Sequence, residues 1–425
     1  MNISSARDSL STALGHRFFY GWVVVAIAGL GIFASGPGQS HMFSVFVGPI
    51  SEDLGLSKAV IASAYGSATL VSAFLLPYMG ALVDRHGPRR MMLWIVLLLG
   101  AACMLFGAAG GLLTLVLAFG LLRFLGQGSL MMNCANLVGQ WFNRRRGVAA
   151  SLMALGFAAS MALHPPLALF LIQEIGWRQA WVVLGLLTWA VMLPPVLLLV
   201  YDKPEDRGLE PDGDAAIKTS VGLSHSIDGL SLAEALRTPT FYVLMAGWFG
   251  MSLGVTTLHF YQVTVLTRQG VAPELAASAF SISAVVMAAA MPLVGRTFDR
   301  FRTRYVFIAG LLVTAASLTS ITLAHDFWTV LVYAGFFGVN NAFTLTMVGY
   351  LMPRYFGRRH LGRLQGAGQT VGVLGASVGP LPVGLALDML GDPTMTLRLL
   401  ALYPCLCAGA ALLLLRTPRG VTYPP

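Results

Sequence analysis

The chain has 425 residues, of which 56% are hydrophobic and only 11% are charged, and its net charge is +9. A soluble domain of this length needs far fewer apolar side chains to fill its core, so the composition excludes an ordinary soluble protein and indicates a membrane protein. The basic excess would also suit a nucleic-acid partner, but the positions of the basic residues give a better explanation, and no such partner is expected.

The sequence divides into twelve predominantly apolar segments, most of them longer than the ~20 residues that cross a ~30 Å hydrocarbon core as a helix. We expect an all-α membrane protein with helices at 19–48, 58–82, 91–109, 112–140, 147–172, 178–201, 239–267, 275–298, 304–324, 327–352, 361–388 and 395–416. The first segment is too long for the core of a signal peptide and is expected to remain. The four cysteines lie in apolar segments, which argues against disulfides and a metal site: Cys103, Cys134, Cys405 and Cys407.

The basic residues are distributed unevenly between the two sides of the predicted helices. Of the 27 Lys and Arg, 22 fall on one side, four fall on the other, and Arg123 lies within a helix. Basic residues concentrate in cytoplasmic loops, so both termini are expected in the cytoplasm and the protein in the inner membrane. The four on the opposite, outer side are Lys58, Arg178, Arg268 and Arg398.

An internal repeat relates the two halves of the sequence. GALVDRHGPRR at 80–90 is matched by GRTFDRFRTR at 295–304, and WFNRRRGVAASLMALG from 141 is matched by YFGRRHLGRLQGAGQT from 355, so the two offsets agree to within a single position. We expect a six-helix bundle over 1–201, a cytoplasmic linker over 202–238 and a second bundle over 239–425. Parallel repeats of this kind pack around a pseudo-two-fold axis along the membrane normal, with the substrate site near mid-membrane.

The loop at 80–90 resembles the signature between the second and third helices of the major facilitator superfamily. The resemblance implies a conformational latch, in which a carboxylate at a helix end pairs with arginine. Its residues are Gly80, Asp84, Arg85, Gly87, Arg89 and Arg90, with Asp299 and Arg300 in the second copy. The second copy has Arg302 in place of the glycine, so the second latch is expected to be weaker.

Two further motifs resemble the bacterial monocarboxylate porter and oxalate/formate antiporter group. They are FYGWVVV at the start of the first helix and WFNRRRGVAASLMALG at the start of the fifth. The resemblance implies transport of small carboxylates, often with a proton. The group commonly has an Arg in the eighth helix and a Lys in the first or eleventh, but here the eighth helix has no Arg before Arg296, and neither of the others has a Lys at mid-membrane.

Arg123 is the single charged residue between Gly111 and Phe142. At ~1.5 Å per helical residue it lies ~18 Å from the outer end of its helix and ~30 Å from Arg144, too far for its side chain to reach the aqueous boundary. An arginine at this depth costs at least ~2.5–3.5 kcal/mol and is expected to face a cavity, an anion or buried acceptors. We interpret it as a substrate-binding cation; the alternative is a structural tie to neighbouring carbonyls.

Polar residues elsewhere in the membrane segments complete the predicted site. On the fourth helix, Asn133 shares a face with Gly126, Ser129, Asn136 and Gln140, although small residues and amides also serve as interhelical contacts. His41 follows the helix-breaking GPGQS, His259 lies in the seventh helix, and His164 is expected to be structural. The other predicted substrate-binding residues are Gln39, Tyr261, Asn340, Asn341, Gln365 and Gln369.

All 18 Asp and Glu are assigned to loops, termini or helix ends, so a proton site built on a membrane carboxylate is not expected. Any proton coupling would use His41 or His259, whose ordinary pKa of ~6.5 suits the task. No phosphate-binding loop, metal-ligand cluster or catalytic group is present, so the protein is not expected to be an enzyme or to need a cofactor.

The predicted function is alternating-access transport of small organic anions, with monocarboxylates as the leading class, by proton-linked symport or anion exchange. The protein is expected to act as a monomer in a lipid bilayer. Efflux of amphipathic or neutral compounds is one alternative, because the helices are rich in aromatic residues and methionine. A ligand sensor with a transporter fold and no flux is another.

Overall fold

The computed structural model describes residues 19–142, 145–210, 212, 230–356 and 361–416. Within them, ten helices are long and apolar enough to cross a membrane. One of these, α9 (Arg146–Leu199), contains two of the expected spans, because Gly176 interrupts it with a φ of 79°. A broken first span completes the set, so the twelve-span, all-α fold predicted from the sequence is confirmed.

The other elements before the linker are α2 (Gly21–Ala34), η1 (Gly36–Gly38), α3 (Ser40–Phe43), α4 (Val47–Leu54), α5 (Lys58–His86), α6 (Pro88–Gly107), α7 (Leu112–Leu122), η2 (Arg123–Leu130) and α8 (Met131–Trp141). Those after α9 are η3 (Pro204–Arg207), α10 (Leu232–Ala235), α11 (Pro239–Arg268), α12 (Pro273–Arg300), α13 (Thr303–Ser320), η5 (Ile321–Leu323), α14 (Phe327–Phe356), α15 (Leu361–Val378), α16 (Pro380–Met389) and α17 (Thr394–Leu414).

The first span is broken where the sequence predicts it. The helix α2 ends at Ala34, a single 3₁₀ turn covers Gly36–Gly38, and the α-helix resumes at Ser40. Pro37 has no N–H to donate and the glycines on either side have little preference for helix, so GPGQS cannot continue the helix. The first span, expected to end near residue 48, continues as α4 to Leu54.

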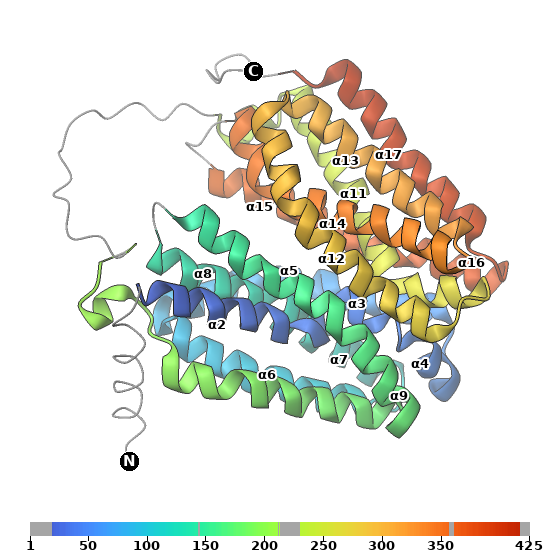
Figure 1. Ribbon diagram of the computed structural model, residues 1–425, viewed down its shortest axis with the longest axis horizontal. Coiled ribbons are helices and arrows are strands. Elements are labelled where there is room, and N and C mark those ends of the chain that lie inside the picture. Colours follow the sequence, from blue (N-terminus) through green and yellow to red (C-terminus); the bar gives the residue numbers. More distant parts are fainter. Residues whose placement is uncertain (1–18, 143–144, 211, 213–229, 357–360, 417–425) are drawn as a thin grey trace. The chain divides into compact units, whose positions relative to one another are not determined.

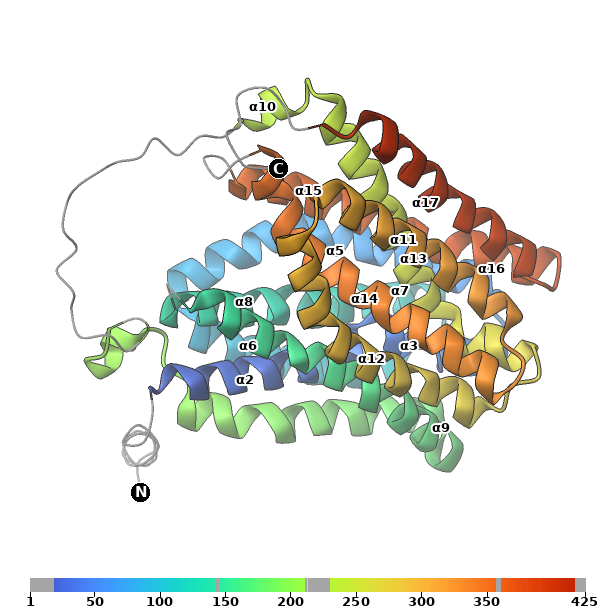
Figure 2. The ribbon, with the colours of Figure 1, turned by 45° about the horizontal axis from the view of Figure 1, so that its top comes forward.

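The chain divides into two compact units. The first comprises Met1–Met42 and Val71–Val221, and the second Phe43–Leu70 and Gly222–Pro425. In the first unit, α2 and α6 each pack along α9 (Figure 1). In the second, α12 packs on α14, α13 on α17 and α11 on α15, as can be followed in Figure 2. The bundle boundaries expected at 201 and 239 stay a prediction.

The internal repeat is visible in equivalent hydrogen bonds. In the first unit, Arg89 Nη2 donates to the carbonyl of Leu197 over 3.1 Å. In the second unit, Arg304 Nη2 donates to the carbonyl of Leu412. The interval between the two arginines equals that between the two leucines, and it is the same interval that relates the two copies of the signature loop. In both units, therefore, the arginine near the start of the third span of the repeat is bonded to the end of the sixth.

Candidate functional site

Arg123 begins η2, the π-helical segment within the fourth span. Only 2% of its surface is exposed. Its Nη1 donates to the carbonyl of Gly38 over 2.9 Å and to the hydroxyl of Ser40 over 3.3 Å. Both of these acceptors are neutral oxygens of the first unit. Arg123 is therefore bonded to the break in the first span. This is the structural tie that the sequence left open as the alternative to substrate binding.

The break and η2 cross at very short range. A Cβ added at Gly38 would lie 2.3 Å from the carbonyl oxygen of Leu122 and 2.9 Å from Cα of Gly126. A Cβ added at Gly126 would in turn lie 2.9 Å from Cα of Gly38 and 3.1 Å from the carbonyl oxygen of Ser35. Glycine at both positions allows the backbones to approach closely enough for Arg123 to reach the carbonyl of Gly38.

The π-helix also accounts for the change in repeat offset. The fourth span begins at Leu112 and the tenth at Phe327, and these two positions keep the offset of the signature loops. Further along the chain, Trp141 is matched by Tyr355, and the offset of this pair is smaller by one. The segment from Leu112 to Trp141 is therefore one residue longer than the segment from Phe327 to Tyr355. The first repeat therefore has one extra residue within its fourth span, and a π-helical turn, with i→i+5 bonding, is the usual way to accommodate one.

Two other predicted residues of the first unit are hydrogen-bonded to neighbouring protein groups. Gln39 is buried, and its Nε2 donates to Ser35 Oγ over 2.9 Å and contacts Sδ of Met131 at 3.1 Å. Asn133 is fully buried, and its Nδ2 donates to the carbonyl of Pro88 over 2.9 Å. The structure therefore places Asn133 against the start of α6, as an interhelical contact.

His41 lies beside a second histidine. Its Nε2 is 3.2 Å from Ser160 Oγ, and the same hydroxyl is 3.1 Å from Nδ1 of His164. From the sequence the two histidines were expected to act separately, and Ser160 was not expected to take part. A serine in an apolar helix gives no signal of its own, and only the crossing of α3 with α9 brings the three together.

In the second unit, His259 is enclosed by aromatic rings. It is 5% exposed on α11. The ring of Phe280 from α12 stacks with its centroid at 6.1 Å, and Phe337 from α14 meets it edge-on at 4.9 Å. Arg123 stands at the point where the repeat offset changes, so it matches Gly338 by the earlier offset and Phe337 by the later one; by either, the second unit has an uncharged residue where the first has a cation.

The remaining predicted residues of the second unit do not gather in one place. Tyr261 donates to the carbonyl of Lys58 over 3.0 Å. Asn340 accepts from Thr314 Oγ1 at 2.8 Å, and Asn341 donates to the carbonyl of Phe337 at 2.8 Å. Gln369 is exposed on α15, and the side chain of Gln365 lies outside what the structure describes.

The signature loop is described only in part. Gly87 joins α5 to α6 with a φ of 82°, and a Cβ there would lie 2.8 Å from Oδ1 of Asp202. That carboxylate accepts the backbone N–H of Arg89 at 2.6 Å, a contact that the sequence analysis did not anticipate. Gly80 is half-buried in α5, and Arg85, Arg90 and Arg300 are exposed. The side chains of Asp84 and Asp299 lie outside the described part of the chain.

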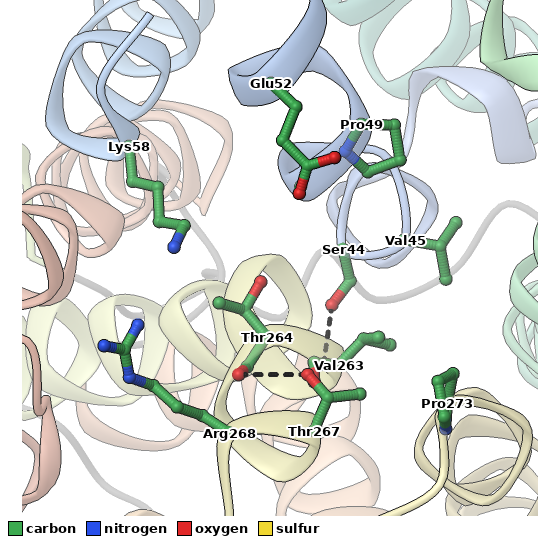
Figure 3. Close-up of a pocket in the computed structure, with 11 residues that line it drawn as sticks. Ser44, Val45, Pro49, Glu52, Lys58, Val263, Thr264, Thr267, Arg268 and Pro273 are labelled. Carbon is green, nitrogen blue, oxygen red and sulfur yellow. Dashed lines mark hydrogen bonds between the residues drawn. The ribbon is translucent and has the colours of Figure 1, made fainter.

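The second unit contains an open pocket of about 450 Å³ between α4, the start of α5 and the end of α11. Figure 3 shows the Lys58 ammonium and the Arg268 guanidinium on the same side of it, with the Glu52 carboxylate apart from them. Hydroxyl-bearing Thr264 and Thr267 also line the pocket. Two of the four cations predicted on the outer side thus meet at one pocket, which their separation in sequence concealed.

Comparison with known proteins agrees with this architecture. Residues 21–269 and 263–425 match the model of the Major Facilitator Superfamily. The chain is 24% identical over 379 residues to the oxalate:formate antiporter of Oxalobacter formigenes, covering 86% of this chain and 85% of the antiporter. It is 22% identical over 340 residues to human monocarboxylate transporter 2, covering 75% and 70%.

The fold is that of a solved transporter. The crystal structure of a bacterial homologue of the human lysosomal transporter Spinster, inward-facing and unoccupied, superposes with a TM-score of 0.73 at 17% identity, over 94% of this chain and 97% of the other. The molecule is thus a multi-pass membrane transporter and not an enzyme. It belongs to the Major Facilitator Superfamily, as the loop at 80–90 indicated, and is related to the oxalate:formate antiporter and the monocarboxylate transporters.

Proposed function

We propose that this transporter moves small organic anions, with monocarboxylates as the main class, by proton-linked symport or anion exchange. The observation that carries the proposal is Arg123, a cation with 2% exposure whose Nη1 is bonded to two neutral oxygens. These bonds fix the guanidinium in position at the break in the first span. A carboxylate bound nearby would offset the cost of holding that charge within the membrane.

The position of the cation supports an anion in the first unit. Arg123 contacts the break in the first span, where the 3₁₀ turn over Gly36–Gly38 interrupts regular helix. Irregular backbone within a membrane is tolerated where it lines a cavity or is buried in protein, and in transporters broken helices commonly bind the substrate. The repeat supplies no second cation at the matching position, and one positive charge suits a monoanion better than a dianion.

The orientation of the chain is part of the same proposal. The excess of Lys and Arg in the loops on one side supports an orientation with both termini in the cytoplasm and the chain in the inner membrane. The pocket lined by Lys58 and Arg268 then lies on the outer side.

The test is a thermal-shift measurement on purified protein with formate, acetate, L-lactate and oxalate, compared with neutral and cationic amphiphiles. A ligand that binds the native state at one hundred times its Kd stabilises it by about 2.7 kcal/mol. We expect a monocarboxylate to raise the Tm of the wild type and to have no effect on a folded Arg123→Ala variant.

The matched control is Arg178→Ala. Arg178 also donates to two backbone carbonyls of the first unit, those of Gly107 and Ala109, but it lies at a helix end. This variant should keep the full response to the anion. If Arg123→Ala responds as the wild type does, or if only amphiphiles stabilise the protein, Arg123 is a structural tie alone and efflux of amphipathic compounds becomes the better assignment. Binding without flux in proteoliposomes would favour a sensor.

A further inference from the structure

Three buried side chains of the first unit form one continuous hydrogen-bonded chain. His41 Nε2 lies 3.2 Å from Ser160 Oγ, and Ser160 Oγ lies 3.1 Å from His164 Nδ1. The same Nδ1 is also 3.1 Å from the backbone carbonyl of Ser160. His41 and Ser160 are fully buried, and His164 is 7% exposed. Two imidazoles therefore share one hydroxyl, away from bulk water.

The packing around the rings holds this arrangement in place. Phe157 meets the ring of His41 edge-on with centroids 5.5 Å apart, and Phe33 lies 4.7 Å from the ring of His164. Gly36 faces His164 so closely that an added Cβ would lie 2.4 Å from its Cε1. The break in the first span thus leaves room for the second imidazole.

Few charged groups lie on the elements around the hydrogen-bonded residues His41, Ser160 and His164. The sequences of α2, η1, α3, α7 and α8 contain no Asp, Glu, Lys or Arg, and the part of α9 before Gly176 has Arg146 and Glu174 at its opposite ends. The remaining charge is Arg123, at the start of η2, which donates to Ser40, the neighbour of His41. A proton taken up by the histidines would therefore add a second positive charge to the segment that Arg123 already holds.

A serine hydroxyl has one proton and donates it once. When Ser160 donates to one imidazole nitrogen, the other imidazole must donate to Ser160, so the protonation of the two rings is linked. We propose that His41, Ser160 and His164 form a single proton-binding site, in which one proton passes between the two rings through the Ser160 hydroxyl. Its role in transport rests on the function proposed above, whereas the site itself does not.

The transfer balances at each atom. A proton that binds to Nε2 of neutral His164 makes that ring cationic. The N–H bond at His164 Nδ1 then breaks as an O–H bond forms on Ser160, and the original O–H bond of Ser160 breaks as an N–H bond forms at His41 Nε2. His164 is left neutral with its hydrogen on Nε2, the hydroxyl is regenerated, and the positive charge lies on His41, next to Ser40.

This site also predicts how proton and substrate interact. A carboxylate held by Arg123 at the same break would favour the protonated form of His41, and binding linkage requires the proton to strengthen carboxylate binding by the same factor. An anion and a proton would then bind together more readily than either binds alone.

The experiment is ¹⁵N NMR of the full-length protein with labelled histidine, because imidazole nitrogen shifts distinguish the two tautomers and the cation. The His41→Asn and His164→Asn variants assign the signals. In the wild type between pH 5 and 8 we expect the two rings to take up one proton together, with one midpoint seen at both. Ser160→Ala should replace it with two independent transitions, and Ser160→Thr, which keeps the hydroxyl, should restore it.

Ser129→Ala is the matched control, since Ser129 is also buried but its hydroxyl donates to the carbonyl of Phe124 in its own span. It should leave the histidine titration unchanged. The proposal is overturned if Ser160→Ala titrates as the wild type does, if each ring takes up its own proton, or if neither changes state over this range. Acetate should raise the shared midpoint; an unchanged midpoint would refute the anion-binding role of this region while leaving the proton site intact.

Discussion

Replacing Gly38 by alanine tests whether the position of Arg123, and not its charge alone, creates the site. The added Cβ would lie 2.3 Å from the carbonyl oxygen of Leu122 and 2.9 Å from Cα of Gly126. Both are backbone atoms, so the crossing must open by roughly 1 Å to reach ordinary contact, and overpacking of this kind costs ~1–3 kcal/mol. The bond from Arg123 to Gly38 would lengthen with it, and hydrogen bonds to charged groups contribute ~1.5–3 kcal/mol.

The two effects together predict a loss of roughly 2.5–6 kcal/mol in the free energy of unfolding, measured by denaturant titration of the detergent-solubilised protein. The anion-induced rise in Tm should disappear although Arg123 is still present. Gly409→Ala is the control: Gly409 has no neighbouring atom within 4 Å of an added Cβ, and alanine favours its helix by up to ~1 kcal/mol. Wild-type stability together with a full anion response in Gly38→Ala would refute the argument.

Three further predictions concern the second unit. Asp388 accepts the backbone N–H groups of Lys58 and Ala59 at 3.1 and 2.7 Å, so Asp388→Ala should lower the Tm through loss of a helix cap, typically ~1 kcal/mol, and unchanged melting would contradict this. At the pocket lined by Lys58 and Arg268, a cysteine introduced at Thr264 should react faster with an anionic than with a cationic methanethiosulfonate, and Lys58→Gln should reduce that preference. Equal rates for the two reagents would mean that Lys58 and Arg268 do not set the electrostatic potential of the pocket. Hydrogen bonds from the hydroxyl and the backbone N–H of Thr329 hold the pKa of Asp326 below its usual 3.8, so the stability it contributes is present above pH 3.8 and lost as the pH falls through the lower, folded-state pKa. Thr329→Val removes the hydroxyl bond and keeps the backbone one, so it should reduce this acid-dependent contribution in melting curves, and an unchanged acid dependence would contradict this.

Features that depend on nearby residues could be predicted from the sequence. The spans follow from runs of apolar side chains, and the interruption of the first follows from Gly36, Pro37 and Gly38. The repeat could be aligned, and the structure adds the equivalent bonds of Arg89 and Arg304. The depth of Arg123 within its membrane span was enough to predict that its side chain meets an anion or buried acceptors. The structure shows two such acceptors, the carbonyl of Gly38 and the hydroxyl of Ser40.

Features that depend on how helices cross could not be predicted. The stripe through Asn133 assumes 3.6 residues per turn, but η2 inserts one residue and rotates everything after it, so Asn133 bonds to Pro88 of α6. His164 was expected to be structural, and the contact that joins it to His41 arises only where α9 meets the break. Cys405 is exposed on α17 although its segment is apolar, because composition does not say which face of a helix meets neighbouring helices.

The extra residue in the fourth span has a consequence for how the two halves came to differ. If both descend from one duplicated ancestor, a change of a single codon in one copy was enough to make the fourth span differ from the tenth by η2 and to turn every later side chain of that helix onto another face. The other copy, α14, is an uninterrupted α-helix with no charged residue at the matching position. One half could thus acquire a charged crossing while the other kept an apolar one. Deleting a single residue of η2 would give the fourth span the helical phase of the tenth.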